Sequence, residues 1–284
     1  MFSIELENEN GNIVDINDEV SYVVTGISGL NPPSATLFTR KSPTRKGSKH
    51  NGSTLDERIV IIHIKILGDI EKNRNALYSW CEPEQYVKIY YKNGVKGIYC
   101  EGHVTDCDVD LFTTNEVLSL AVTCEDPYLK DLQAIETAIS VYLNEFTFPF
   151  SIELNEDVPI SSIRDNNLTT ILNTGAETGV KITVFCKGAL SNLTLYDGKD
   201  ISKKITIKYT FSTNTIIEID TEASPKTVRA ILPNGTNMNV MKYLDANPHW
   251  FTLKKGYNII GHYSDSTSTA YDVTVSYRNK HLGV

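Results

Sequence analysis

The chain has 284 residues, of which 40% are hydrophobic, and its formal net charge is −8. This composition can bury a sizeable core, and the length favours two domains over one. A net acidic chain is not expected to bind nucleic acid generally, because neutralising phosphate requires clustered Lys and Arg. The chain has no run of eighteen apolar residues, and its first residues are acidic where a signal peptide is basic. We therefore expect neither membrane insertion nor export through a cleaved signal.

Motifs for chemistry are missing from the sequence. The five cysteines include no Cys-x-x-Cys pair, which argues against a disulfide framework or a zinc site and predicts buried free thiols. The six histidines include no pair at metal-ligand spacing, and there is no nucleophile elbow and no glycine-rich phosphate loop. We therefore predict no catalytic residue, no cofactor and no metal site.

The chain begins with two short apolar segments, Phe2–Leu6 and Tyr22–Val24, which predict an opening hairpin. The segment from Arg40 to Ser53 follows and contains five Lys or Arg and no acidic residue, so the rest of the chain carries −13. Its Gly and Ser content predicts a loop outside the core. Two interpretations stay open: a solvated, mobile loop, or a loop that reaches an acidic neighbour or nucleic acid.

These basic residues form a candidate subunit-contact loop, whose members are Arg40, Lys41, Arg45, Lys46 and Lys49.

The next stretch predicts a strand, a helix and a second strand. Residues 58–67 alternate between an apolar face and a face with Lys and His, which is typical of a central strand. Asp69 is placed to cap a helix that begins near Ile70, and Pro83 ends that helix by about Cys81. A strand over Tyr86–Tyr91 follows, and an Asn-Gly turn leads out of it.

Further strands are predicted over 95–105 and 117–123, and the β-branched run 131–143 favours a strand over a helix. The Pro-bearing stretch 146–152 predicts an edge or a linker. We place the domain boundary there, which gives domains 1–145 and 146–284.

The second domain is predicted to be a β-sandwich, since short strands and turns recur at regular spacing. The predicted strands are 180–186, 193–196, 205–211, 215–220, 227–231, 250–253, 256–260 and 270–277. Many aromatic residues in this half suggest a platform for a sugar ring. Because Trp250 and Phe251 are adjacent in a predicted strand, one of them faces inward and only one is free to act as that platform.

In their order along the chain, several short motifs resemble the distal tail proteins of long, non-contractile-tailed bacteriophages. The motifs are Gly26-Ile27-Ser28-Gly29-Leu30, Gly68-Asp69-Ile70-Glu71, Arg74 with Leu77-Tyr78, Cys124 with Asp126-Pro127-Tyr128, Phe146 with Phe148-Pro149-Phe150-Ser151, Ile216 with Asp220-Thr221, Tyr243-Leu244, and Tyr277-Arg278 with Leu282-Gly283-Val284. The resemblance spans nearly the whole chain.

This resemblance implies a mainly β fold. Its first domain is an N-terminal β-sandwich or split-barrel ring domain with one short α-helix, and its second is a C-terminal galectin-like β-sandwich. It implies a structural virion protein without catalysis, which forms a homo-hexameric ring at the distal end of the tail. The implied partners are the tail tube protein, the tail-tip hub protein and receptor-binding proteins, with DNA only as passing cargo, in a virion assembled in the host cytoplasm.

Two other hypotheses remain beside the structural ring protein. The first is a carbohydrate-binding module that contacts host cell-surface glycans, and the second is a hydrolase. The native mass separates the ring protein from the other two, because a ring must be oligomeric.

Overall fold

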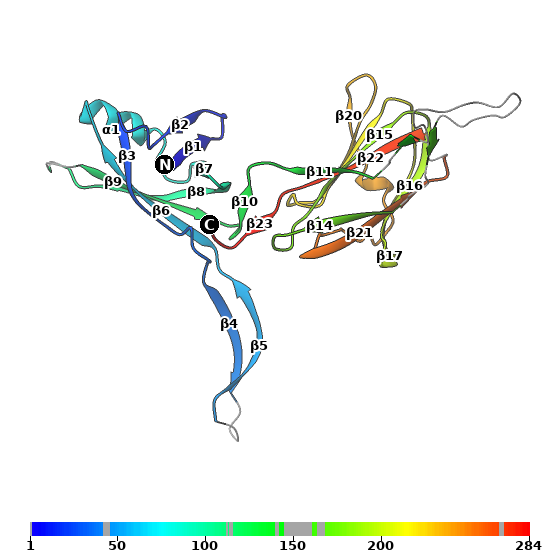
Figure 1. Ribbon diagram of the computed structural model, residues 1–284, viewed down its shortest axis with the longest axis horizontal. Helices are drawn as coiled ribbons and strands as arrows, with labels where there is room; N and C mark the ends of the chain where they lie inside the picture. Colours follow the sequence, from blue (N-terminus) through cyan, green and yellow to red (C-terminus); the bar gives the residue numbers. More distant parts are fainter. Residues whose placement is uncertain are drawn as a thin grey trace, which may run out of the picture. The chain divides into compact units, whose positions relative to one another are not determined.

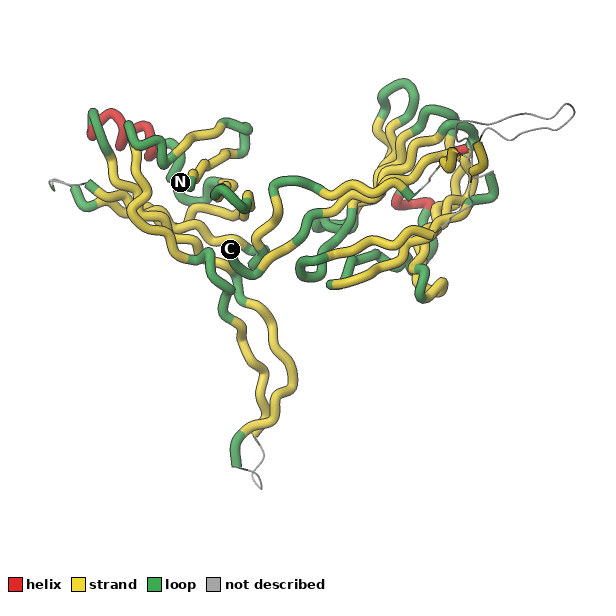
Figure 2. Tube along the Cα trace, viewed as in Figure 1, coloured by secondary structure: helices red, strands yellow, loops and turns green. Residues whose placement is uncertain are grey.

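The computed structural model describes residues 2–41, 46–111, 113, 116–139, 142–144, 161–163, 168–266 and 270–284. These residues fall into two compact units, residues 1–132 with 280–284, and residues 133–279. Both units are built mainly of β-strands (Figures 1 and 2), which confirms the predicted fold class. The Pro-bearing stretch 146–152 lies outside the described residues.

The first unit contains the only α-helix of the described residues. Its elements are β1 (Ser3–Asn8), β2 (Ile13–Asp15), β3 (Tyr22–Ser28), β4 (Ala35–Lys41), β5 (Ser48–Leu55), β6 (Arg58–Ile66), α1 (Ile70–Tyr78), β7 (Tyr86–Lys92), β8 (Gly97–Val109), β9 (Val117–Cys124), β10 (Leu129–Asp131) and β23 (Lys280–His281).

One sheet of the first unit runs in the order β2-β1-β7-β8-β9-β6-β3, and β10 pairs with both β8 and β23. Ile4 of β1 and Ile62 of β6, from distant strands of this sheet, are both fully buried in one core. The sheet therefore curls around that core, and the register shift in β8 between Val104 and Asp106 supplies a local bend. The expected hairpin of Phe2–Leu6 with Tyr22–Val24 is wrong, because β1 pairs with β2 and β7 while β3 pairs with β6.

The predicted central strand and helix are confirmed. Burial alternates strictly along β6, with every even-numbered residue buried, as period-two patterning requires. Helix α1 begins at Ile70, and the Asp69 side chain accepts a hydrogen bond from the Lys72 backbone N–H at 3.3 Å. Leu77 of the helix is fully buried against the sheet.

The second unit is a β-sandwich. Its elements are β11 (Ile135–Ala138), β12 (Tyr142–Asn144), β13 (Ser161–Ile163), β14 (Leu168–Asn173), β15 (Lys181–Cys186), β16 (Leu190–Asp197), β17 (Asp200–Phe211), β18 (Ile216–Asp220), β19 (Thr227–Ile231), β20 (Asn237–Asn239), the 3-10 helix η1 (Met241–Tyr243), β21 (Gly256–Tyr263) and β22 (Tyr271–Tyr277).

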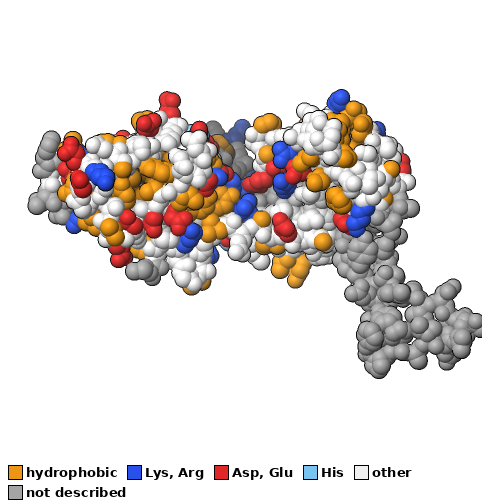
Figure 3. Space-filling model, turned by 90° about the horizontal axis from the view of Figure 1, so that it is seen from above, with side chains coloured by type: hydrophobic (Ala, Val, Ile, Leu, Met, Phe, Trp, Pro, Cys, Tyr) orange, Lys and Arg blue, Asp and Glu red, His pale blue; other side chains and the backbone are white. Residues whose placement is uncertain are grey.

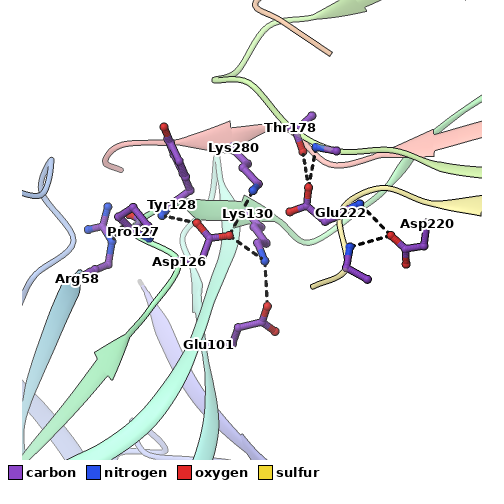
Figure 4. A network of polar contacts seen from close by, with 12 residues as sticks. Arg58, Glu101, Asp126, Pro127, Tyr128, Lys130, Thr178, Asp220, Glu222 and Lys280 are labelled. Atoms are coloured by element: carbon purple, nitrogen blue, oxygen red, sulfur yellow. Dashed lines mark hydrogen bonds and ion pairs between the residues drawn. The ribbon is translucent and has the colours of Figure 1, made fainter. Parts of the chain in front are cut away.

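Its two main sheets have the orders β11-β22-β15-β18-β19-β20 and β14-β21-β16-β17, while β12 and β13 pair only with each other. One buried core draws residues from both main sheets. Ile182 and Leu195 are fully buried members of that core, one from each sheet. The run 250–253 is not a strand, since only Leu253 forms an isolated bridge, with Thr178. Strands β14 and β20 were not predicted. The turn after β18 is held by Glu222, which accepts hydrogen bonds from Gly179 and Thr178 (Figure 4).

The compact units divide the chain at other positions than the expected domain bounds. Strand β11 pairs with β22 of the second unit, although it precedes residue 146. Strand β23 pairs with β10 of the first unit, although it lies at the carboxy terminus. The chain therefore returns to the first unit after completing the second, an arrangement that sequence periodicity does not encode.

A polar network secures this return. Lys130 on β10 contacts Glu101 at 2.9 Å and Asp126 at 3.2 Å, and Lys280 on β23 contacts Asp126 at 3.3 Å (Figure 4). Burial opposes ionisation of the Asp126 carboxyl, but Lys280 and Lys130 outweigh it, so the pKa of Asp126 lies below its ordinary value. The pKa of Glu101 is lowered in the same way, with Lys130 outweighing burial.

We predict that Asp69→Ala lowers the free energy of unfolding by about 1 kcal/mol, because the first turn of α1 loses its capping acceptor. Asp69→Ser, which keeps a capping oxygen, should retain most of the stability. Urea unfolding of both variants measures this, and an unchanged midpoint for Asp69→Ala would contradict it.

We also predict that Lys130→Met costs about 2 kcal/mol at pH 7, since two carboxylates lose a charged hydrogen-bond donor. The depressed carboxyl pKa values mean that this stability is present at neutral pH and lost as the pH falls below about 4. The difference between wild type and Lys130→Met should therefore shrink at pH 3. Urea titrations at both pH values test this, with the exposed Lys96→Met as control; an equal difference at both would refute it.

Candidate interaction site

The predicted basic loop is mostly a β-hairpin. Strands β4 and β5 pair antiparallel from Ala35 with Leu55 to Lys41 with Ser48, and they project as an arm from the first unit (Figures 1 and 2). The prediction of a loop was therefore wrong for these strands, while the prediction that the segment lies outside the core is confirmed. Every residue of β4 is exposed, and only Gly52 and Leu55 of β5 are partly covered.

The arm keeps both of its strand edges open among the described residues, since β4 and β5 form a two-stranded sheet by themselves. A two-stranded hairpin without a packed face is marginally stable in water. Open edges also present unpaired backbone N–H and C=O groups to any extended partner chain. The arm thus has the features of a binding element rather than of a folding element.

The charges on the arm are unbalanced. Arg40 lies directly opposite Lys49 in the register, and like charges in that position destabilise a hairpin. Within the described part of the chain, no acidic side chain forms an ion pair with Arg40, Lys41, Lys46 or Lys49; the fifth predicted residue, Arg45, lies outside it. An acidic partner would relieve this repulsion.

Two large apolar side chains on the arm were missed by the sequence interpretation. Leu37 is 62% exposed and Phe38 is 53% exposed. Adjacent strand residues point to opposite faces, so each face of the hairpin presents one apolar side chain. A charged surface with aromatic and aliphatic anchors is characteristic of protein interfaces. The sequence Thr-Leu-Phe-Thr, just before the basic residues, could have indicated these apolar side chains.

The base of the arm is fixed by side chains. Asp56 accepts hydrogen bonds from the hydroxyls of Ser34 at 2.9 Å and Thr36 at 2.7 Å. The Thr36 and Ser34 hydroxyls lower the pKa of the Asp56 carboxyl. The backbone N–H of Asp56 also donates to Ser34, so the two strands are closed where they leave the unit.

Arg58, the first residue of β6, is 2% exposed and is the main anchor beneath this base. Its guanidinium donates to the Pro127 carbonyl at 2.8 Å, to the Asn31 carbonyl at 2.8 Å and to the Gly29 carbonyl. It also donates to the Leu282 carbonyl at 2.8 Å. Figure 4 shows Arg58 beside Pro127. Burial lowers the pKa of Arg58, but an arginine starts so high that it remains charged at neutral pH.

Gly29 allows the segment before β4 to pack closely against the backbone of β6 at Ile59. Its φ is +87°, and a Cβ there would lie 2.1 Å from the Ile59 carbonyl oxygen. The backbone N–H of Val284 donates to Leu30, so the carboxy-terminal residues pack against the same segment that leads into β4.

The described residues contain no cluster suited to a metal ion. No group of three His, Cys, Asp or Glu could hold a metal ion there, and the five cysteines are free thiols. Phe251 is 4% exposed and belongs to the core, while Trp250 is partly buried against it. Of this pair, Phe251 therefore faces inward and Trp250 stays partly exposed, so only Trp250 remains a candidate for the sugar platform. No helix among the described residues is long and apolar enough to span a membrane.

Comparisons with known proteins agree with this architecture. Residues 173–281 match the family model of the siphovirus-type tail component, C-terminal domain. The fold matches the crystal structure of SPP1 Dit, which is described as a paradigm of the hub adsorption apparatus in phages that infect Gram-positive hosts. The match covers 99% of each chain, with a TM-score of 0.71 and 14% identity. A chain of the phage P2 baseplate in its activated conformation with Ca matches over 100% of both chains, with a TM-score of 0.58 and 11% identity. No curated protein sequence matches the chain.

The chain is thus mainly β, and its fold is similar to that of solved phage tail and baseplate proteins. Residues 173–281 match the siphovirus-type tail component domain, and the fold over the whole length is similar to that of SPP1 Dit. The resemblance drawn from the short motifs is confirmed.

We predict that Arg58→Met lowers the free energy of unfolding by about 3 kcal/mol, because several buried carbonyls lose their charged donor. Arg58→Lys should recover only part of this, since an ammonium cannot span four acceptors. The control is Arg229→Met, which removes an exposed ion pair with Glu218 and should cost under about 1 kcal/mol. Thermal and urea unfolding give the values, and equal losses for Arg58→Met and the control would contradict the anchor role.

Proposed function

We propose that the protein forms a homo-hexameric ring at the distal end of the phage tail and joins the tail tube to the tip hub and the adsorption apparatus. The observation that carries this is the fold match along the whole chain to SPP1 Dit, a hub protein, together with the family match of the second unit. On this proposal the first unit, with its curled sheet, closes the ring, and the galectin-like sandwich lies outside it. Catalysis has no part in this function.

The β4–β5 hairpin is the proposed contact with a neighbouring subunit or with the tail tube protein. Ordering its chain costs about 1–2 kcal/mol per residue fixed, and exposed ion pairs return little. The contact must therefore also use the open strand edges, as an added strand, and the apolar anchors Leu37 and Phe38. Charge then supplies orientation and association rate more than affinity.

The charge of the assembly suits a DNA conduit. Six copies at −8 each carry about −48, and acidic walls let DNA pass as cargo without holding it. On the face drawn in Figure 3, acidic and basic side chains are interspersed rather than gathered into one patch of a single sign. We therefore assign the basic arm a position along the tail axis or against a neighbour, away from the channel. Assembly into the virion takes place in the host cytoplasm.

The test replaces Arg40, Lys41, Arg45, Lys46 and Lys49 with Ser and follows assembly by light scattering against salt concentration. Wild-type association should weaken as salt rises, because screening removes the steering charges. The variant should assemble poorly at every salt concentration.

A matched control makes the same charge change elsewhere, at the exposed lysines Lys72, Lys96, Lys203, Lys254 and Lys255. It should assemble like the wild type. A hairpin variant that forms rings normally would refute the contact role of the arm, and a wild-type protein that stays monomeric with its tail partners present would refute the ring itself.

A further inference from the structure

A second candidate surface lies on the sandwich. The outer face of the sheet β14-β21-β16-β17 is hollowed, and the hollow has a volume of about 450 Å³. Its floor and walls include Asn192, Thr194, Thr206, Asp245, Tyr263 and Asp265. The hollow belongs to the second unit alone, and its size is within the range of small-molecule sites.

The floor is made of hydroxyl groups. Leu193 and Leu195 point into the core, so Thr194 between them points to the opposite face. It is nevertheless only 2% exposed, so it lies beneath the surface of the hollow. Its hydroxyl donates to the Thr206 hydroxyl at 3.1 Å on the paired strand. A pair of hydroxyls at the bottom of a hollow can both donate and accept hydrogen bonds.

An aromatic wall stands beside this floor. Tyr263 is opposite Thr194 in the register and is 40% exposed. Its ring is 5.8 Å from the Tyr196 ring, at an interplanar angle of 50°. The Tyr196 ring lies across Gly261, where a Cβ would come 2.3 Å from Tyr196 Cζ. The missing side chain at Gly261 thus seats Tyr196, which in turn supports Tyr263.

The backbone is bent to aim one side chain into the hollow. Asn192 has a φ of +53° and stands at a register shift between Ser191 and Leu193. Such bulges re-aim side chains and often lie next to functional sites, and a non-glycine residue with positive φ is a reason to look for function. The Asn192 amide donates to the Asp265 carboxylate at 2.6 Å, which leaves further acceptor capacity on Asp265.

The charges around the rim cancel. Lys208 pairs with Asp245 at 2.6 Å, and Lys204 and Asp265 add one charge of each sign to the lining. A lining with no net charge, many hydrogen-bonding groups and one accessible ring does not favour an apolar ligand or a polyanion. It suits a neutral molecule with many hydroxyls and a flat apolar face.

We propose that this hollow binds a neutral saccharide. One sugar ring stacks on Tyr263, its hydroxyls exchange hydrogen bonds with the partly exposed Thr206, which Thr194 holds from below, and Asp265 with Asn192 fixes its orientation. The site is open, so we expect a single copy to bind in the millimolar range, about −4 kcal/mol. Several copies in one assembly would strengthen attachment to a polysaccharide through avidity. This proposal goes beyond the ring function and holds for a monomer as well.

The test is saturation-transfer difference NMR on the full-length protein at 10 mM of each probe. The neutral probes are trisaccharides of glucose, galactose and N-acetylglucosamine, and the anionic probe is oligo(glycerol phosphate). At least one neutral trisaccharide should give a signal. Tyr263→Ala and Asp265→Asn should each weaken its binding at least tenfold while leaving the melting temperature within a few degrees of wild type.

Tyr257→Ala is the matched control. Tyr257 lies on the same strand β21 and by period two on the same face, it is 68% exposed, and it is not part of the hollow. The Tyr257→Ala variant should bind the trisaccharide as the wild type does. Three results would each overturn the proposal: no signal from any neutral probe, binding of the anionic probe alone, or an equal loss of saccharide binding in Tyr257→Ala and Tyr263→Ala. The mass of the assembly tests the ring separately.

Discussion

The first unit depends on one buried cation. Arg58 stands at the start of the most apolar strand of the chain, and burying a guanidinium there is tolerable only because backbone carbonyls surround it. These carbonyls come from three places far apart in the sequence: the segment before β4, the segment after β9 and the carboxy-terminal tail. A lysine ammonium, with three donors on one nitrogen, could not satisfy all of them at once. The fork of five donors is what lets one residue join three chain segments.

The Arg58 anchor holds the base of the hairpin in place, whereas the rest of the hairpin is only weakly stabilised. Below Ser34 and Asp56 the chain is held by the hydrogen bonds of the buried Arg58 side chain, and above them β4 and β5 pair only with each other. Local stability therefore falls steeply from base to tip. An arm of this kind keeps its direction while its surface adapts to a partner, so less of the ordering cost remains when the contact forms.

The sequence predicted what is local and missed what is distant. The alternation in β6, the cap at Asp69 and the spacing of strands in the sandwich are written within a few residues of each other, and they appear in the structure. The hairpin was missed because a strand without a core face has no apolar alternation, so its Gly, Ser and Lys content indicated a loop. The strand predicted over 250–253 is absent because Phe251 and Leu253, although buried in the core, belong to a loop. Burial of alternate residues therefore did not mean a strand. The acceptors of Arg58 could not be predicted, since Leu282 is 224 residues away. At the candidate interaction site the basic residues were found, whereas Leu37 and Phe38 were not.

The chain shares its fold with SPP1 Dit at only 14% identity. Core alternation and strand pairing tolerate almost any apolar residue of suitable size, so topology persists while surfaces change. Two surfaces of this chain carry the proposed contacts: the basic arm of the first unit and the hydroxyl-lined face of the second. Both occupy places where the fold places no demand on the side chain. Charge repulsion between Arg40 and Lys49, and a positive φ at Asn192, are costs that the folded monomer alone does not explain. Contacts outside the monomer are the physical reason for a chain to retain them.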